Sequence, residues 1–301
     1  MASGKERTAE AARAQPLSVI IPTRDRAAIL ARTLAALRDL RAELPALDVI
    51  VVDDGSASAP GELSSAADPH FDVRILRRPA LGPAAARNFA IARARHERIL
   101  LLGDDTRPAP GCLKLHACAR DGLQGRIEWD PQNPVTPVMQ FLAPAGPQFW
   151  FAGLVDGAPI PFTGILGSNY SAPAAWFRAE PYDEGFRDAA FEDTELAWRF
   201  RLRGYRSRFS AAAICWHDHA YESIEPFLTR QERAGEAARY GVSRHPALAW
   251  WALARPLAVE LARRTGLRPI APALRQWDRH CRHAYLRGFF GWRSSSAGAV
   301  A

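Results

Sequence analysis

Four short apolar runs alternate with helical patterns along the first third of the chain. The runs are rich in valine, isoleucine and leucine and occupy residues 17–21, 48–52, 73–76 and 99–102. Runs of this length without polar alternation are typical of strands buried on both faces, as in a parallel sheet. Between them, leucines repeat at helical spacing over residues 27–44, and a proline opens a second helical pattern over 83–94. The alternation predicts an α/β fold with an open, mostly parallel sheet flanked by helices.

The rest of the chain has weaker patterns. Residues 124–170 are rich in proline, glycine and aromatic residues, which predicts loops and irregular strands that form a substrate-specific wall. A helix is expected from Phe191 to a stop at Gly204, then a short strand over 211–216, then two or three helices. We therefore expect a disordered leader at 1–15, one α/β half at 16–122, a second half at 123–222, a helical extension at 223–293 and a tail at 294–301.

The composition is that of a folded protein. Of the 301 residues 48% are hydrophobic and 24% are charged, which excludes a chain that is wholly disordered, collagenous or coiled coil. The net charge of +7 permits contact with polyanions without requiring it. The four cysteines have no paired spacing, which favours a reducing compartment. The longest apolar stretch, residues 247–262, is interrupted by Arg255 and Pro256 and is too short to span a bilayer, so a cytoplasmic location is expected.

Polar side chains follow three of the predicted strands at the point where each strand ends. These segments are Pro22-Thr23-Arg24, Asp53-Asp54-Gly55-Ser56 and Gly103-Asp104-Asp105-Thr106. In open α/β sheets, ligands bind at the carboxyl ends of the strands. An isolated Asp-Asp-Gly-Ser segment is more typical of a turn or helix cap. Two carboxylate pairs at one edge would repel each other, however, unless a cation or a donor-rich ligand lies between them.

Six segments together resemble a known family. In chain order they are LSVIIPTRDR, VIVVDDGS, LGPAAARNFA, ILLLGDDTRP, FEDTELAWRFRLRGY and ICWHDH, which extend from about Leu17 to about His219. In this order and spacing they resemble the family 2 glycosyltransferases of the GT-A fold. The resemblance implies a Rossmann-like, mostly parallel central sheet with a C-terminal helical extension. It also implies an inverting enzyme that uses a nucleotide-diphosphate sugar and a divalent cation, Mg²⁺ or Mn²⁺.

The resemblance assigns a group of residues to the nucleotide. Asp54 matches the aspartate that reads a pyrimidine base, and Pro22, Thr23 and Arg24 line the same pocket. Arg87, at the start of the second helix, offers a planar donor fork to the base or the diphosphate. An ordinary surface arginine is the competing interpretation of Arg87.

The resemblance also implies a cation site. Asp105 matches the metal-ligating aspartate of the family's Asp-x-Asp motif, in which Gly103 here replaces the first aspartate. The ribose contact of that missing carboxylate then passes to Asp104. His217 follows the last strand and matches a histidine beside the metal or the diphosphate, with His219 as a close competitor.

A catalytic base is implied by the Glu-Asp segment. Asp193 matches the carboxylate that takes the proton from the acceptor hydroxyl during an inverting transfer. Helix capping is the competing interpretation, because acidic residues stabilise the first turn of a helix. Asn169, Glu192 and Arg199 are the expected contacts to the acceptor or the diphosphate. Arg199 could instead pair with Glu195, four residues earlier.

These assignments predict an enzyme of polysaccharide biosynthesis. It would move a sugar from a UDP- or dTDP-sugar to a hydroxyl of a glycan or a lipid-linked acceptor. A relative that binds sugar nucleotides without catalysis is an alternative, because Gly103 replaces a motif carboxylate. A nucleotidyltransferase is a second alternative, which the absence of glycine from residues 22–27 disfavours.

A basic binding module is a third alternative. It would contact an anionic membrane or a nucleic acid through arginine and aromatic residues of the last helices. These residues are Arg263, Arg264, Arg268, Arg275, Arg279, Arg282, Arg287 and Arg293, with Trp277, Tyr285, Phe289, Phe290 and Trp292. Because such a module explains none of the carboxylates, we expect only an accessory, peripheral contact with the inner face of a membrane and no nucleic-acid partner.

Overall fold

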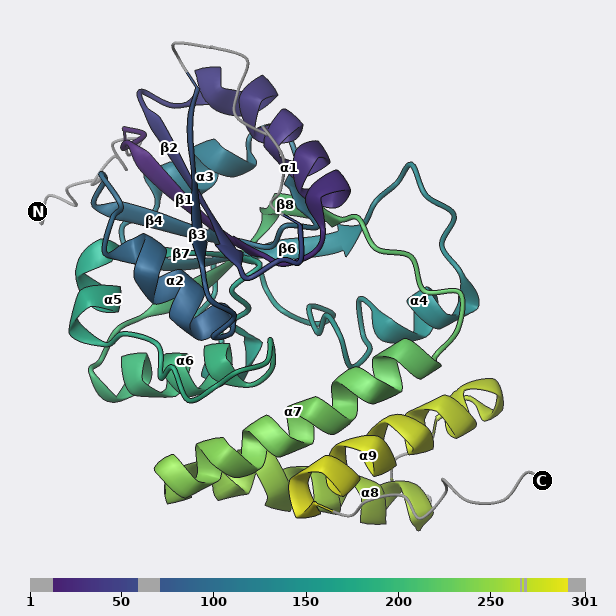
Figure 1. Ribbon diagram of the computed structural model, residues 1–301. Helices are drawn as coiled ribbons and strands as arrows, with labels where there is room; N and C mark the ends of the chain where they lie inside the picture. The colour runs from purple at the N-terminus through teal and green to yellow at the C-terminus, as the bar shows by residue number, and fades with distance from the viewer. Residues whose placement is uncertain (1–12, 59–70, 266, 268–269, 292–301) are drawn as a thin grey trace, which may run out of the picture.

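The computed structural model describes residues 13–58, 71–265, 267 and 270–291, and in these residues the chain forms an eight-stranded mixed sheet flanked by helices (Figure 1). The strands are β1 (Leu17–Thr23), β2 (Leu47–Asp54), β3 (Asp72–Arg78), β4 (Arg98–Leu102), β5 (Thr106–Pro108), β6 (Gly122–Trp129), β7 (Asn169–Pro173) and β8 (Ser207–His217). The α-helices are α1 (Ala27–Leu40), α2 (Pro83–Ile91), α3 (Cys112–Cys118), α4 (Pro137–Leu142), α5 (Ala174–Ala179), α6 (Glu192–Leu202), α7 (Glu225–Arg244), α8 (Arg255–Arg264) and α9 (Arg275–Phe290).

The first four strands form the parallel half of the sheet, as predicted. The strand order is β3-β2-β1-β4-β7-β6-β8-β5, and β1 pairs in parallel with both β2 and β4. Successive side chains of β1 enter different cores: Ile20 packs in the cluster that includes α2, whereas Val19 and Ile21 pack with α1. Full burial of each such side chain stabilises the fold by about 1.5–3 kcal/mol. The two cores therefore fix the register of β1 from both faces.

Two central strands lie where the sequence predicted loops and irregular strands. β7 runs antiparallel to β4, and β6 lies between β7 and β8. Both strands carry polar side chains that are buried and hydrogen bonded inside the protein, which hides them from a search for apolar runs. The Gln124 amide donates to the carbonyl oxygens of Gly125 and Asn169, and Ser171 accepts from Arg98 at 2.7 Å. The expectation of irregular strands fits β6, whose pairing with β8 shifts register between Gly125 and Arg126, whereas the expectation of loops was wrong for both segments.

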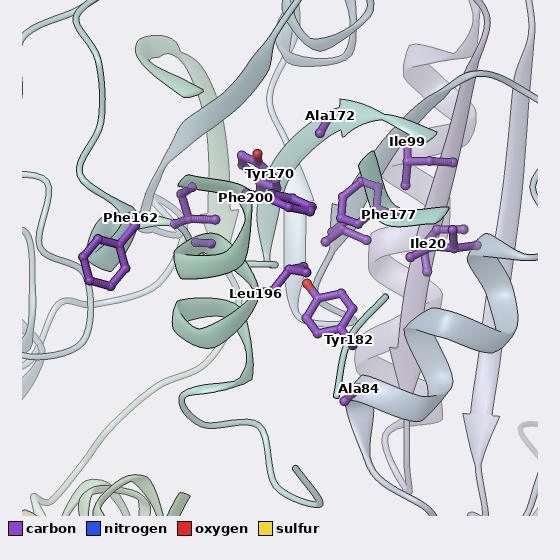
Figure 2. Close-up of a cluster of buried hydrophobic side chains, with 14 of the residues drawn as sticks. Ile20, Ala84, Ile99, Phe162, Tyr170, Ala172, Phe177, Tyr182, Leu196 and Phe200 are labelled. Carbon is purple, nitrogen blue, oxygen red and sulfur yellow. The ribbon is translucent and has the colours of Figure 1, made fainter. Parts of the chain in front are cut away.

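An aromatic cluster fills the space between the second half of the sheet and α6. Figure 2 shows Tyr170 on β7, Phe177 on α5 and Phe200 on α6 in this cluster, beside Ile20 and Ile99 from the parallel strands. The rings of Phe177 and Phe200 meet edge to face, with centroids 5.5 Å apart. This shared core joins the two halves of the sheet, so that the loops at its edge are held in fixed relative positions.

Three long helices form a separate layer after β8, which confirms the predicted C-terminal helices (Figure 1). α7 packs along α9, where Ala238 and Phe289 share a buried cluster with Ala252. Within the described ranges, no helix combines the length and the apolar character needed to cross a bilayer. Residues 1–12 of the leader predicted at 1–15, and the whole tail predicted at 294–301, lie outside the described residues.

The basic residues of the last helices are largely paired with acids rather than free. Arg264 and Arg282 each contact Glu260 at 2.6 Å, and Arg263 lies 3.4 Å from Asp278. Most of the aromatic residues singled out above are also internal: Phe289 is buried, Trp277 packs on Phe141, and the Tyr285 hydroxyl donates to the Ala252 carbonyl oxygen. Phe290 is exposed, while Arg268, Trp292 and Arg293 lie outside the described residues. The described part of these helices therefore presents no continuous face of basic and exposed aromatic residues.

Candidate active site

A cleft of about 320 Å³ opens at the carboxyl ends of β1, β2, β4 and β8. Most of the predicted site residues line it, namely Pro22, Thr23, Arg24, Asp54, Arg87, Asp104, Asp105 and His217. Parallel strands that end at one edge bring these residues together although they are far apart in the sequence. The cleft is also lined by residues from other elements, including Phe149, Ser168, Arg187 and Arg230.

One arginine bridges the carboxylate pair at the end of β4. Nη1 of Arg26 donates to Oδ1 of Asp104 and Nη2 donates to Oδ2 of Asp105, both at 2.8 Å. Thr23 completes the arrangement by donating from its hydroxyl to Oδ2 of Asp104 at 2.7 Å. A guanidinium group that spans two carboxylates offsets their mutual repulsion through charge-assisted hydrogen bonds.

The two carboxylates differ in their affinity for protons. Burial and the adjacent Asp105 raise the pKa of Asp104 to about 6. Burial alone would also raise the pKa of Asp105, but His217 and Arg26 hold that pKa well below its usual range. Asp105 is therefore the carboxylate that stays ionised and able to bind a cation at every physiological pH.

Asp105 and His217 together fit a divalent cation. Nε2 of His217 lies 3.4 Å from Oδ2 of Asp105, and Nδ1 of the same ring is buried without a hydrogen-bond partner among the described residues. A carboxylate with an imidazole suits Mn²⁺, and Mg²⁺ or Mn²⁺ is commonly held by one or two protein groups plus phosphate oxygens. No group of three His, Cys, Asp or Glu side chains in the described residues is arranged to hold a metal ion. A cation here would therefore draw its remaining ligands from a diphosphate.

The packing around Gly103 leaves little room for a side chain. A Cβ at Gly103 would lie 2.5 Å from the Thr106 hydroxyl oxygen and 3.0 Å from Oδ1 of Asp105. Contacts this close would force the surrounding groups to move. The carboxylate that reaches the cleft beside Asp105 is that of Asp104.

Asp54 lies in the cleft at the end of β2, but its oxygens are already in use. Oδ1 accepts from the backbone N–H of Leu81 at 3.0 Å and Oδ2 from that of Gly82 at 2.7 Å. These bonds hold the loop before α2 against β2. Each carboxylate oxygen has a second lone pair, so Asp54 retains the capacity to accept from a base N–H.

Arg87 connects α2 to the start of α6. Its Nη1 donates to Oε1 of Glu192 at 2.8 Å and lies 3.5 Å from Oδ1 of Asp193. Although burial opposes the charge, Asp193, Tyr182 and Glu192 raise the pKa of Arg87 above its ordinary value. Arg87 is 5% exposed, so the surface-arginine interpretation is wrong.

Asp193 is held by groups from three different segments. Gly167 donates its backbone N–H to Oδ2 at 2.7 Å, and the Tyr182 hydroxyl donates to Oδ1 at 2.8 Å. A Cβ at Gly167 would lie 2.6 Å from Oδ1 of Asp193, so a larger residue there would displace the carboxylate. Asp193 is not among the residues that line the cleft, but it adjoins two of them: Arg87 lies 3.5 Å from its Oδ1, and Gly167 directly precedes Ser168.

Two predicted contacts lie elsewhere, and their positions correct the sequence-based expectation. The Asn169 side chain is fully buried and donates to the carbonyl oxygens of Arg126 and Ala213, so it braces the sheet interior. Arg199 pairs with Glu195 at 2.7 Å and with Glu180 at 2.9 Å, which is the alternative that its spacing offered. Neither side chain lines the cleft.

Glu192 and His219, the neighbours of Asp193 and His217 in the Glu-Asp and His-x-His segments, do not line the cleft. Glu192 is buried against Arg87, where its carboxylate supports the arginine rather than facing the cleft. The His219 ring lies behind that of His217, with centroids 5.8 Å apart. Of the two histidines, His217 is the one that lines the cleft and contacts Asp105.

Sequence reasoning missed Arg26, which lies two residues beyond Arg24. One signal could have found it. Arg26 is the N-cap of α1, where arginine is a poor choice because its charge opposes the helix dipole and its side chain makes no capping bond. An unfavourable residue at a helix start, directly after a strand of the functional edge, indicates that its side chain serves another purpose.

Comparisons with known proteins agree with this geometry. The Glycosyl transferase family 2 model matches residues 18–117. The pre-mycofactocin glycosyltransferase of Mycobacterium tuberculosis (strain CDC 1551 / Oshkosh) is 29% identical over 242 residues, which cover 76% of this chain and 48% of that protein. The chain thus spans about half the length of this curated relative.

Solved structures show the same architecture. The mannosyltransferase PcManGT from Pyrobaculum calidifontis, in complex with GDP-Man and Mn²⁺, matches with a TM-score of 0.63 at 15% identity, over 93% of this chain and 89% of that chain. S. aureus TarS 1–349 in complex with UDP-GlcNAc matches with a TM-score of 0.51 at 16% identity, over 91% of this chain and 89% of that chain. These similarities confirm the predicted GT-A fold.

Proposed function

We propose that the chain, whose residues 18–117 match the Glycosyl transferase family 2 model, transfers a sugar from a nucleotide-diphosphate sugar to an acceptor hydroxyl, with inversion at the anomeric carbon. The observation that carries the proposal is the arrangement of opposing groups around one cleft. Asp105 and His217 line the cleft 3.4 Å apart, and Asp193 adjoins it through Arg87, which lines the cleft 3.5 Å from Oδ1 of Asp193. An inverting transfer needs these two functions on different sides of the reacting carbon.

In this proposal Asp105 and His217 hold a divalent cation together with the oxygens of the diphosphate. When bound, Mg²⁺ or Mn²⁺ supplies positive charge that stabilises the leaving group as the glycosidic bond breaks. Arg187 and Arg230 also line the cleft and add positive charge for the same phosphates. The protein's own part is to hold the diphosphate in one orientation.

Asp193 is the proposed general base. The bonds from Gly167 and Tyr182 fix the direction of its carboxylate, while Arg87 balances the charge of Asp193 and Glu192. The Asp193 carboxylate would take the proton from the acceptor hydroxyl as that oxygen attacks the sugar. A positioned base of this kind contributes roughly 10²–10⁴-fold to the rate.

A UDP- or dTDP-sugar is the donor that we propose, with a glycan or a lipid-linked hydroxyl as acceptor. Support for a pyrimidine base comes from Asp54, which lies in the cleft with a carboxylate able to accept from a base N–H. The solved structures with this fold carry GDP-Man in one case and UDP-GlcNAc in the other, so the fold itself accommodates either kind of base. A screen of nucleotides with different bases therefore tests which base the donor carries.

A screen of nucleotides tests this proposal directly. Thermal unfolding would be followed with UDP, dTDP, GDP and ADP, each with and without Mn²⁺, because selective binding to the folded state raises the melting temperature. We expect UDP or dTDP to stabilise the protein, and only in the presence of Mn²⁺. Equal stabilisation by all four nucleotides, or stabilisation that is the same with and without Mn²⁺, would contradict the proposal.

A peripheral membrane contact is the second part of the proposed function. Leu257 and Leu261 on α8 are 40% and 63% exposed, and they border an apolar hollow with Phe290 of α9, beside Arg264 and Arg287. Because Arg264 and Arg287 are paired with Glu260 and Glu232, the exposed apolar side chains would carry this contact. Such contact would bring the cleft to a lipid-linked acceptor at the inner face of a membrane.

A further inference from the structure

Arg26 competes for the same oxygen that a divalent cation would need. Oδ2 of Asp105 is 2.8 Å from Nη2 of Arg26 and 3.4 Å from Nε2 of His217. The guanidinium also contacts Asp104, so one positive group is shared by both carboxylates at the metal end of the cleft. A cation bound by Asp105 and His217 would come too close to this guanidinium for both to stay in place, because like charges at contact distance repel strongly.

We propose that Arg26 is a built-in counter-cation that holds Asp104 and Asp105 until a divalent cation arrives, and then passes from Asp105 to the diphosphate. The inference rests on the proposed function, since it concerns the same cation and the same donor. No bond is made or broken in this exchange: one ion pair replaces another. Its consequence is that the cation and the nucleotide bind together rather than separately.

The surroundings of Arg26 permit its side chain to move while its backbone stays fixed. The Arg26 side chain is 33% exposed, whereas those of Asp104 and Asp105 are 8% and 14% exposed. The preceding residue, Asp25, is anchored at both ends: its N–H donates to the Ser56 hydroxyl at 2.8 Å and its carboxylate accepts from Ala57 at 2.7 Å. The exchange therefore needs only rotation of the arginine side chain within the cleft.

Charge explains why the exchange would require the nucleotide. With Arg26 in place, the pair of carboxylates presents less negative charge to an incoming cation, so a metal ion alone gains little by displacing it. A diphosphate adds negative charge and offers the displaced guanidinium a new bidentate partner. Coupling between two ligands of this kind typically changes affinity by about 5–150-fold.

A purely structural clamp makes the opposite prediction. If Arg26 served only to keep the two carboxylates close together, its removal would let them separate and would weaken the binding of a metal ion. If Arg26 competes with the cation, its removal strengthens that binding. The direction of the change in metal affinity thus separates the two roles.

The test measures Mn²⁺ binding to the full chain by the loss of the free-ion electron paramagnetic resonance signal, without nucleotide and with UDP or dTDP. In Arg26→Gln, we expect Mn²⁺ without nucleotide to bind roughly tenfold tighter than in the unsubstituted protein, and UDP or dTDP at saturating Mn²⁺ to bind roughly tenfold more weakly. Arg26→Lys, which keeps the charge but not the fork, should change both affinities less. Arg178→Gln removes a charge outside the cleft, where Arg178 pairs with Glu97 at 3.1 Å, so its Mn²⁺ affinity without nucleotide should stay close to that of the unsubstituted protein.

Each other outcome has a defined meaning. Weaker or unchanged Mn²⁺ binding in Arg26→Gln, while the unsubstituted protein binds Mn²⁺ with nucleotide, would overturn this inference and leave the proposed function intact. A similar gain in Arg178→Gln would overturn it as well, since general charge would then be the cause. Failure of every variant to bind Mn²⁺ with any nucleotide would overturn both the inference and the metal-dependent function.

Discussion

The Tyr182 hydroxyl donates a 2.8 Å hydrogen bond to Oδ1 of Asp193. Burial and the neighbouring Asp193 raise the pKa of Tyr182 well above its usual value, so the phenol remains a hydrogen-bond donor. With Gly167 bound to the other oxygen, the carboxylate cannot rotate freely. Tyr182 is thus a positioning residue for the proposed base, because it touches Asp193 rather than the acceptor.

We expect substitution of the base to affect turnover far more than binding. Asp193→Asn should lower kcat by roughly 10²–10⁴-fold and leave the KM for the nucleotide sugar nearly unchanged. Tyr182→Phe removes one hydrogen bond to a charged group, about 1.5–3 kcal/mol, and should lower kcat by roughly tenfold or more. Steady-state kinetics would measure both, with Tyr205→Phe as the control because Tyr205 stacks on Trp176 away from the cleft. Parallel losses in kcat and affinity would indicate a structural helix start instead.

The carboxylate pair allows a comparison of its two members. Asp105→Asn should abolish the part of nucleotide binding that depends on Mn²⁺, because it removes the carboxylate that stays ionised beside His217. Asp104→Asn should retain that dependence, since Asp104 contacts Thr23 and Arg26 but not His217 in the described structure. Calorimetric titration with UDP or dTDP, with and without Mn²⁺, would distinguish them. A larger effect of Asp104→Asn would place the metal ligand one residue earlier.

Glu192 should make the stability of the protein depend on pH. Burial and the neighbouring Asp193 raise its pKa from 4.5 to about 7, and Arg87 only partly offsets them. Between these two values the folded protein holds a proton that the unfolded chain releases, so the free energy of unfolding should fall as the pH rises from about 4.5 to 7. Glu192→Gln removes this contribution. Urea unfolding at several pH values should show a flatter profile for the variant, and an identical profile would contradict the assignment.

Exposed leucines on α8 make the proposed membrane contact testable. The full chain should sediment with vesicles that contain anionic lipid, and Leu261→Asp should weaken this by roughly tenfold, because an inserted leucine contributes about 1.5–3 kcal/mol. Leu202→Asp is the matched control, since Leu202 is 66% exposed on α6, outside the α8 surface. If the unsubstituted protein does not sediment with anionic vesicles at low salt, the proposed membrane contact is wrong and the exposed leucines serve another contact.

The sequence predicted the parallel strands β1, β2 and β4 better than it predicted β6 and β7 at the centre of the sheet. β1, β2 and β4 are continuous apolar runs because both of their faces are buried. Their positions therefore follow from the pattern of hydrophobic residues alone. β6 and β7 could not be found in this way. Their buried Gln124, Asn169 and Ser171 are stabilised by hydrogen bonds to partners far away in the sequence, which hydropathy does not register.

The same contrast holds for the site. Asp54, Asp105 and His217 could be placed in one cleft because each lies at the end of a strand of the sheet or just after it. The position of Arg199 could not be decided from spacing, since both a ligand contact and a pair with Glu195 fitted it. The role of Arg26 depends on a side chain that reaches from the start of a helix to another strand, a relationship that exists only in three dimensions.

The reversed direction of β7 determines how the wall of the cleft is attached. β6 runs antiparallel to β7, so β6 leaves the sheet and β7 re-enters it at the same edge. The intervening segment, residues 130–168, therefore begins and ends beside the cleft, and it contributes Phe149 and Ser168 to the lining. A segment attached in this way can change in length near its middle without altering the register of either strand, provided that Gly167 keeps its bond to Asp193. Under the proposed function, a change in the middle of this segment would alter the acceptor side of the cleft while Asp105 and His217 keep their places.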